Sequence, residues 1–390
     1  MSSKVRRVAI LGVGLTRFGV RSESLSALVA QACEAALADG GVDRAEVEAF
    51  YLGNFAAESF TGQSHLAPYA ARALGLRPVP CTRVEGACAS GGLALRQGVL
   101  AVASGAHDLV LVAGAEKMTS VDTRQATHIL SCAGDWEVEV NAGATFPALF
   151  ALIARRYLHQ FDAPREALAA VAVKNQANGL LNPNAHLRKP LTLEQALGGR
   201  PVAEPLGVYD CSLISDGAAA CVLCPWERAR AYRDGAVEVL ASSQASDALA
   251  LEEKAEITRL DATVEAGRRA FDAAGLSPSD VDLAEVHDCF TIAEILAVED
   301  LGFFPKGAGF RAALEGWTSR EGRLPVNTSG GLKAKGHPVG ATGLAQVHEL
   351  VVQLRGEAGE RQVGGAEVGL AQNLGGSGAT CVVHILGPPR

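Results

Sequence analysis

Two residues in separate glycine-rich loops have the types needed for a nucleophile and its base. Cys88 lies in Val84-Glu-Gly-Ala-Cys-Ala-Ser-Gly-Gly92, where a loop is expected to turn into a helix. His337 lies between a glycine and a proline, in a segment dense in glycine. A thiol beside a histidine makes a nucleophile and base pair, and the positive end of a helix lowers a thiol's pKa. Taken alone, Cys88 could equally be a small buried residue and His337 a core histidine.

A second thiol stands at the end of a predicted strand. In Glu285-Val-His-Asp-Cys-Phe-Thr291, the polar residues His287, Asp288 and Cys289 follow an apolar run. Strand ends in α/β folds collect ligand-binding groups, and a thiol beside a histidine is suited to acid/base work. The alternative is a strand end without catalysis, at which Asp288 or Thr291 caps a helix.

A fourth element is the glycine loop Ala371-Gln-Asn-Leu-Gly-Gly-Ser-Gly-Ala379. Its backbone N–H groups, that of Gly375 among them, could bind an oxyanion. A tight hairpin without a catalytic role is the competing interpretation.

Composition narrows the class of protein. The 390 residues suit two fused domains, and 48% hydrophobic with 20% charged residues is a globular balance. A net charge of -8 argues against nucleic-acid binding, and no apolar run approaches the roughly 20 residues that cross a bilayer. The nine cysteines lack a disulfide-like pattern, which favours a reducing cytoplasm. Cys221 and Cys224 lie in an apolar, strand-like run, so we expect no metal site.

Strands and helices alternate in both halves, which predicts a layered α/β fold. The first half has predicted strands at 8–13, 49–53 and 109–113 and helices at 25–39 and 91–103. The second has strands at 236–241, 283–287, 368–373 and 380–385 and helices at 261–274 and 343–354. Cys88 and His337 each precede a helix that leads to a strand, which suggests an internal duplication. Residues 118–205 are more polar and irregular, as expected of a surface excursion that covers a site.

Together these elements resemble the thiolase superfamily over nearly the whole chain. The resemblance rests on Cys88-Ala-Ser-Gly91, on Gly336-His-Pro338 followed by Val-Gly-Ala-Thr-Gly, on Lys117-Met118 and on Tyr209-Asp-Cys-Ser-Leu-Ile-Ser-Asp-Gly-Ala-Ala219. It implies the α/β thiolase fold, with two similar layered α-β-α-β-α halves. The expected division is 1–117 and 206–232 for the N-terminal half, 118–205 for a loop domain over the site, and 233–390 for the C-terminal half.

The chain departs from the commonest thiolases at two motifs. Where many carry Asn-Glu-Ala-Phe, this chain has His287-Asp-Cys-Phe290, and where many carry a C-terminal Cys-x-Gly it has Asn373-Leu-Gly375. Both changes resemble the sterol-carrier-protein-type thiolases, in which the His-Asp-Cys-Phe cysteine supplies the acid/base thiol. One thiol is lost and another gained, which indicates retained catalysis.

The resemblance implies a CoA-dependent acyltransferase that makes or cleaves 3-oxoacyl-CoA by ping-pong Claisen chemistry. His337 would help deprotonate Cys88, which attacks an acyl-CoA, and N–H groups of Cys88 and Gly375 would meet the oxyanion. Cys289 would remove or return the α-proton, while His337 and His287 hold the enolate oxygen.

Coenzyme A and acyl-CoA are expected as substrates, with no tightly bound cofactor. By the same resemblance, Ser212 would contact pantetheine, Phe146 and Phe290 would line the tunnel, and Arg188 would face the phosphates. A homodimer or tetramer is expected, and relatives of this branch often work with a small partner that carries a zinc ribbon and an OB-fold.

Three alternatives remain. A ketosynthase-type condensing enzyme of the same fold would leave Cys289 without a role. A retro-aldolase of the thiolase fold, acting with such a partner, would not need Cys88. A non-catalytic lipid-transfer protein would not need to retain both thiols and both histidines.

Overall fold

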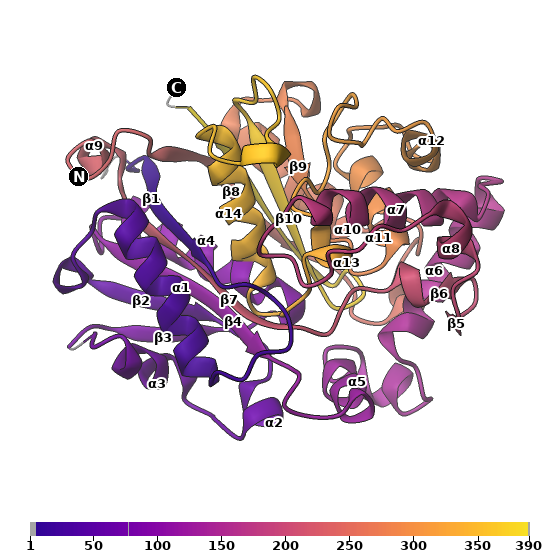
Figure 1. Ribbon diagram of the computed structural model, residues 1–390, viewed down its shortest axis with the longest axis horizontal. Coiled ribbons are helices and arrows are strands. Elements are labelled where there is room, and N and C mark those ends of the chain that lie inside the picture. The colour runs from indigo at the N-terminus through magenta and orange to yellow at the C-terminus, as the bar shows by residue number, and fades with distance from the viewer. Residues whose placement is uncertain (1–4, 77, 389–390) are drawn as a thin grey trace.

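The computed structural model describes residues 5–76 and 78–388. Nine strands form one sheet in the order β3-β2-β4-β7-β1-β8-β11-β10-β9 (Figure 1). Their bounds are β1 Val8–Leu15, β2 Ala49–Gly53, β3 Cys81–Val84, β4 Val110–Lys117, β7 Asp216–Pro225, β8 Val237–Ser246, β9 Leu283–Glu285, β10 Gly369–Gly375 and β11 Thr380–Gly387. A two-stranded sheet pairs β5 Pro201–Ala203 with β6 Leu206–Gly207.

The strand order repeats, as the predicted duplication requires. In the first half, β1 is antiparallel to β7, β7 is antiparallel to β4, and β4 is parallel to β2. In the second half, β8 is antiparallel to β11, β11 is antiparallel to β10, and β10 is parallel to β9. A parallel bridge from Ala284 to Val326 stands where β3 pairs with β2 in the first half. The halves join at β1 and β8, where Ala9 pairs with Glu238 and Ile10 with Val237.

Helices α1 (Leu25–Gly40) and α10 (Asp261–Ala274) occupy matching places in the two halves. Helix α1 packs on β1 and β7, and α10 packs on β8 and β11. Helices α4 (Ser90–Ala103) and α14 (Thr342–Leu354) pack on each other and touch strands of both halves. They are therefore the central helices of the fold.

Glycine lets the central helices meet at backbone distance. A Cβ added to Gly343 would lie 2.3 Å from the backbone nitrogen of Gly92, and one added to Gly91 would lie 2.7 Å from the carbonyl oxygen of Gly340. Helix α4 begins two residues after Cys88 and α14 begins five residues after His337. Because the helices cross at their N-terminal ends, the crossing brings these two residues together.

The expectation of an irregular surface excursion at 118–205 is wrong for most of that segment. It holds helices α5 (Thr123–Ser131), α6 (Phe146–Gln160), α7 (Glu166–Leu180) and α8 (Leu193–Leu197). On α6, the buried residues Phe150, Ile153 and Tyr157 recur at helical spacing and join the largest core cluster. This helical spacing of apolar residues could have predicted α6 from the sequence. The polar residues around it led to the prediction of an irregular segment instead.

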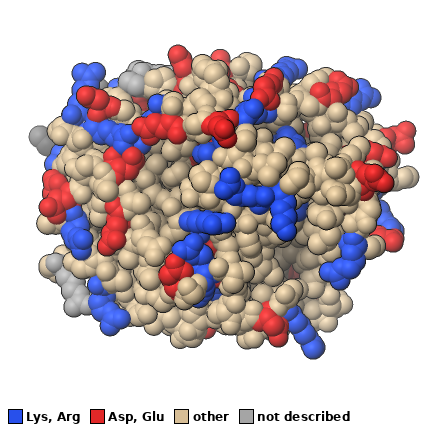
Figure 2. Space-filling view, in the orientation of Figure 1, with Lys and Arg blue, Asp and Glu red and all other residues tan. Residues whose placement is uncertain are grey.

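The remaining elements are short, apart from the ten-residue helix α11. The other helices are α2 Ala57–Thr61, α3 Leu66–Ala73, α9 Trp226–Ala229, α11 Thr291–Asp300, α12 Gly309–Leu314 and α13 Gly331–Ala334. Acidic and basic side chains are interspersed on the face shown in Figure 2. Among the described residues, no helix has the length and apolar character to span a bilayer. The residue boundaries of the four expected segments stay a prediction.

Candidate active site

Cys88 stands at a strained turn that presents its thiol. It lies in the 3-10 turn Ala87–Ala89 between β3 and α4, and Ala87 has a φ of 51°, which is uncommon for a residue with a Cβ. The hydroxyl of Ser90 stabilises this turn, because it accepts from the N–H of Gly86 at 3.0 Å and donates to the carbonyl of Ala87 at 2.6 Å. The nucleophile candidate is thus held by backbone geometry.

The structure brings Cys88, His287 and His337 together. The Cys88 sulfur and one nitrogen of each histidine ring lie within 4.8 Å of one another. The centroids of the two rings are 5.0 Å apart, and the ring planes meet at 81°. These side chains come from the 3-10 turn, the loop after β9 and the loop before α14. Three of the predicted catalytic side chains therefore share one site.

His337 is oriented as a base. Its Nδ1 is 2.7 Å from the hydroxyl oxygen of Thr342, and this hydroxyl donates to the carbonyl of Pro338 at 3.2 Å. The hydroxyl has one hydrogen, so it accepts from Nδ1–H and leaves Nε2 of His337 free to take a proton. Burial and the charge of Lys335 lower the pKa of His337 to about 3, so the ring is neutral at neutral pH.

The prediction of a lowered pKa for Cys88 is wrong. Burial and the charge of Glu116 raise the pKa of this thiol to about 12, although the N–H of Gly376 acts to lower it. Helix α4 begins only at Ser90, and its positive end does not offset the loss of water around the sulfur. The thiol is therefore protonated until a base removes its proton.

Glu116 is a site residue that sequence reasoning missed. Its carboxylate is fully buried at the end of β4, and burial raises its pKa to about 7. It joins the loop after β2 to the loop that carries His337. The donors to it are Asn54 Nδ2 at 2.8 Å and the N–H groups of Phe55 at 2.9 Å, Ala56 at 3.2 Å and Gly340 at 3.2 Å. The sequence feature that could have indicated Glu116 as a site residue is an acidic side chain at the end of an apolar strand.

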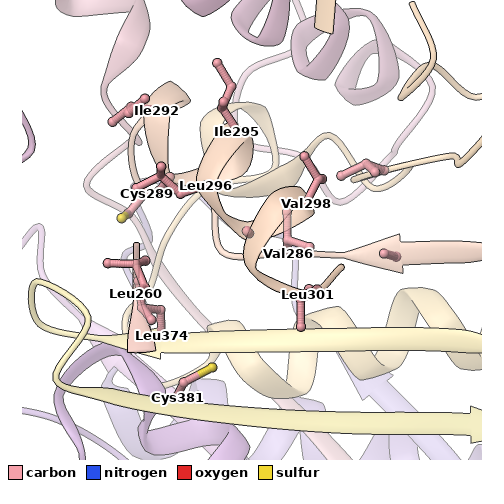
Figure 3. Packing of buried hydrophobic residues seen from close by; sticks show 14 of the residues in the cluster. Leu260, Val286, Cys289, Ile292, Ile295, Leu296, Val298, Leu301, Leu374 and Cys381 are labelled. Atoms are coloured by element: carbon pink, nitrogen blue, oxygen red, sulfur yellow. The ribbon is translucent and has the colours of Figure 1, made fainter. Parts of the chain in front are cut away.

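Cys289 is a member of the largest core cluster, together with Leu296 and Leu374 (Figure 3). Strand β9 ends at Glu285, two residues before the predicted end, so His287 and Cys289 lie in the following loop. Burial, with smaller effects from Cys88 and Asp288, raises the pKa of Cys289 well above its usual value. Cys289 is two residues from His287, in the loop that brings His287 to Cys88.

Asp288 caps a helix, but not the one that follows it in sequence. Its carboxylate accepts from the N–H groups of Leu332 at 2.7 Å and Lys333 at 3.2 Å, in α13, and from Asn175 Nδ2 at 2.8 Å. Helix α13 leads directly into the segment that carries His337. Asp288, which lies between His287 and Cys289, thus fixes the loop that carries His337.

The glycine loop after β10 borders the nucleophile. A Cβ on Gly375 would lie 2.5 Å from the carbonyl oxygen of Gly86, so the two loops touch through backbone. An adjoining cleft of about 700 Å³ is lined by residues that include Ala87, Gly375 and Gly376. The N–H groups of Gly376 and of Cys88 itself act to lower the pKa of the Cys88 thiol, and Gly376 is next to the predicted Gly375.

The predicted CoA contacts divide into two groups. Ser212 donates its N–H to the carbonyl of Cys289 at 2.9 Å, and Phe290 stacks on Phe150 at 4.6 Å. Phe146 packs against the same core cluster. Arg188 is exposed, and its guanidinium donates to the carbonyl of Leu180 at 3.1 Å. All four contacts stay predictions.

Comparison with known proteins identifies the family. The chain matches the model of the thiolase N-terminal domain over residues 8–227 and that of the thiolase C-terminal domain-like family over residues 243–388. The chain belongs to the thiolase family. An acetyl-CoA acetyltransferase of Methanothermobacter thermautotrophicus is 52% identical, with 98% of this thiolase and 99% of the relative covered. Sterol carrier protein 2 of Oryctolagus cuniculus is 36% identical, with 98% of this chain and 73% of the relative covered.

Solved structures agree with this assignment. The structure described as an Ltp2-ChsH2(DUF35) aldolase superposes with a TM-score of 0.86 at 28% identity and covers 98% of both chains. Human mitochondrial 3-ketoacyl-CoA thiolase in complex with CoA superposes with a TM-score of 0.78 at 19% identity and covers 99% of both chains, a likeness of fold. The predicted resemblance and the predicted thiolase fold are confirmed.

Proposed function

We propose that this thiolase is an acetyl-CoA C-acyltransferase that makes or cleaves 3-oxoacyl-CoA through an acyl-Cys88 intermediate. The observation that carries the proposal is the meeting of the Cys88 thiol with two neutral histidines. Relatives that are 52% and 44% identical over nearly the whole chain are named acetyl-CoA acetyltransferase, which supports the acetyl group as the acyl unit.

Acylation requires proton transfer to accompany attack. Since the pKa of Cys88 is about 12, Nε2 of His337 takes the thiol proton as sulfur attacks the thioester carbonyl. The C–S bond to CoA then breaks, and the leaving thiolate takes the proton back from His337. The carbonyl oxygen is negative between these events, and the backbone N–H groups of Cys88 and Gly375 are the proposed donors to it.

Cys289 handles the proton in carbon–carbon bond making and breaking. Burial keeps its thiol protonated in the free enzyme, which suits the cleavage direction. In cleavage, the Cys88 thiolate attacks the 3-oxo carbonyl, the bond between C2 and C3 breaks, and Cys289 protonates the departing enolate carbon. Free CoA then attacks the acyl group on Cys88 and releases the second acyl-CoA. In synthesis the same group removes that proton. His287 is placed to hold the enolate oxygen, and His337 joins it while its Nε2 carries the proton taken from Cys88.

The aldolase alternative is weaker. The neighbouring structure described as an aldolase shows that the fold supports that chemistry in another protein. In this chain, however, Cys88 is present and lies against both histidines, an arrangement that an acyl-enzyme needs and an aldolase does not. The homodimer or tetramer, the small OB-fold and zinc-ribbon partner and the cytoplasmic location remain proposals.

An acyl-enzyme experiment tests this function. The protein is incubated with acetyl-CoA without a second substrate, and intact-mass spectrometry followed by peptide mapping locates the acetyl group. We expect one acetyl group on Cys88, removable by free CoA, and none on a Cys88→Ala variant. The exposed Cys132 gives a matched Cys132→Ala control, which should be acetylated like the wild type. No adduct on Cys88 would overturn the proposal.

A further inference from the structure

Asn373, at the position of the cysteine that many thiolases carry, joins the nucleophile turn to His287. It is 1% exposed on strand β10. Its Oδ1 accepts from the N–H of Gly92 at 3.1 Å, and its Nδ2 donates to the carbonyl of Cys88 at 2.9 Å. The same Nδ2 lies 3.2 Å from Nδ1 of His287. One amide therefore contacts both reactive loops.

The orientation of this amide follows from its backbone partners. The N–H of Gly92 can only donate, so the amide oxygen of Asn373 faces it. The carbonyl of Cys88 can only accept, so the amide nitrogen faces that side. If the amide were flipped, its NH2 group would face the N–H of Gly92 and its oxygen would face the carbonyl oxygen of Cys88. The amide nitrogen of Asn373 therefore directs its second hydrogen at Nδ1 of His287.

This contact decides which nitrogen of His287 carries the proton. Burial and the nearby His337 lower the pKa of His287 well below its usual value, so the ring is neutral with a single N–H. Because Asn373 donates to Nδ1, that atom is the acceptor and the hydrogen resides on Nε2. His337 is the opposite tautomer, with its hydrogen on Nδ1, because the hydroxyl of Thr342 accepts from Nδ1–H.

We propose that Asn373 is a positioning residue that holds His287 as the Nε2–H tautomer, so that His287 donates into the site while His337 accepts there. The use of that donor rests on the proposed function: a donor at this place stabilises an enolate or carbonyl oxygen, whereas a second acceptor would repel it. The sequence change from cysteine to asparagine is thus a gain of a tautomer-fixing amide as well as the loss of a thiol.

The same contact bears on metal binding. A cysteine sulfur and two histidine nitrogens within 4.8 Å of one another are the donor types that Zn²⁺ prefers. A zinc-bound Nε2 must lose its hydrogen, and the proton of a neutral His287 would then sit on Nδ1 against the N–H of Asn373. An aspartate at 373 would reverse this, because a carboxylate accepts Nδ1–H and favours zinc on Nε2.

The decisive experiment compares the wild type with Asn373→Asp by nitrogen NMR of histidine-labelled protein, with the His287 signals assigned from a His287→Gln variant. The wild type should show His287 protonated on Nε2, and Asn373→Asp should show it protonated on Nδ1. Gln372→Met is the matched control, since Gln372 accepts from the backbone N–H of His287 at 2.9 Å without touching Nδ1. It should keep the wild-type tautomer.

A second readout uses zinc alone, measured by calorimetry. Asn373→Asp should bind one Zn²⁺ at least 10-fold more tightly than the wild type, and the binding should disappear in Asn373→Asp with Cys88→Ala. An Nδ1–H tautomer in the wild type, or equal zinc affinity in the two proteins, would overturn the proposal. Wild-type NMR decides the matter even where the variant does not fold.

Kinetics separate this proposal from the function itself. Asn373→Asp should slow exchange of the acetyl-CoA methyl protons with solvent by about 100-fold, the effect of one lost oxyanion donor, with acylation of Cys88 affected less. A proton exchange rate equal to that of the wild type would refute the enolate role. The carboxylate also fails to donate to the carbonyl of Cys88, so acylation slows as well. The tautomer and zinc measurements need no turnover, so they stand or fail apart from thiolase activity.

Discussion

Replacing Asp288 with alanine should destabilise the protein by about 3–6 kcal/mol, because three buried donors lose their acceptor. These are the N–H groups of Leu332 and Lys333 and the side-chain amide of Asn175. A buried donor without a partner costs about 1–3 kcal/mol. Burial and the charge of Glu294 raise the pKa of Asp288 to about 7, so removing the carboxylate also relieves repulsion. Three such donors would cost about 3–9 kcal/mol, and the relief places the expected value in the lower half of that range, about 3–6 kcal/mol.

Urea unfolding at neutral pH measures this prediction, with the free energy of unfolding extrapolated to water. The matched control is Asp282→Ala, because Asp282 also accepts two backbone N–H groups, at 2.8 and 2.9 Å, but is exposed. Water replaces the acceptor there, so we expect a loss under about 1 kcal/mol. The reasoning is refuted if Asp288→Ala costs no more than Asp282→Ala.

Two further predictions concern the loop of His337. Gly331→Ala should destabilise the protein by about 1–3 kcal/mol more than Gly356→Ala. A Cβ at Gly331 would lie 2.3 Å from Asp288, whereas Gly356, also at positive φ, has open space; equal thermal midpoints would contradict this. The folded pKa of His337 is about 3, below the ordinary 6.5. The folded state then binds fewer protons, so the stability from the neutral ring is full above pH 6.5 and is lost as pH falls toward 3. His337→Gln should therefore flatten the fall in unfolding free energy between pH 7 and pH 4, and an unchanged slope would show another cause.

The motifs around Cys88 and His337 could be predicted from sequence because each is local. A glycine loop, a reactive side chain and a helix start stand within a few residues, and the helix predicted at 343–354 is α14, Thr342–Leu354. The same pattern suggested an internal duplication, whereas the strand order is known only from the structure. The roles of the individual site residues remain predictions.

What sequence reasoning missed depends on distant contacts. The high pKa of Cys88 comes from burial and from Glu116, a residue on another strand. Asp288 was weighed as a cap for the next helix, and its acceptor role on α13 joins residues 44 and 45 positions apart. Asn373 was noticed only as a missing cysteine, since its partners, Gly92 and His287, come from both halves. Such contacts exist only once the central helices have crossed.

The most direct measurement is cleavage of acetoacetyl-CoA with free CoA by the wild type, Cys88→Ala and Cys289→Ala. The account predicts turnover by the wild type and a loss of at least about 100-fold in each variant. Acetyl-CoA should still label Cys289→Ala at Cys88 and should leave Cys88→Ala unlabelled. A Cys88→Ala variant that cleaves acetoacetyl-CoA at the wild-type rate, or a wild type inert on short and long 3-oxoacyl-CoA alike, would contradict the two-thiol mechanism.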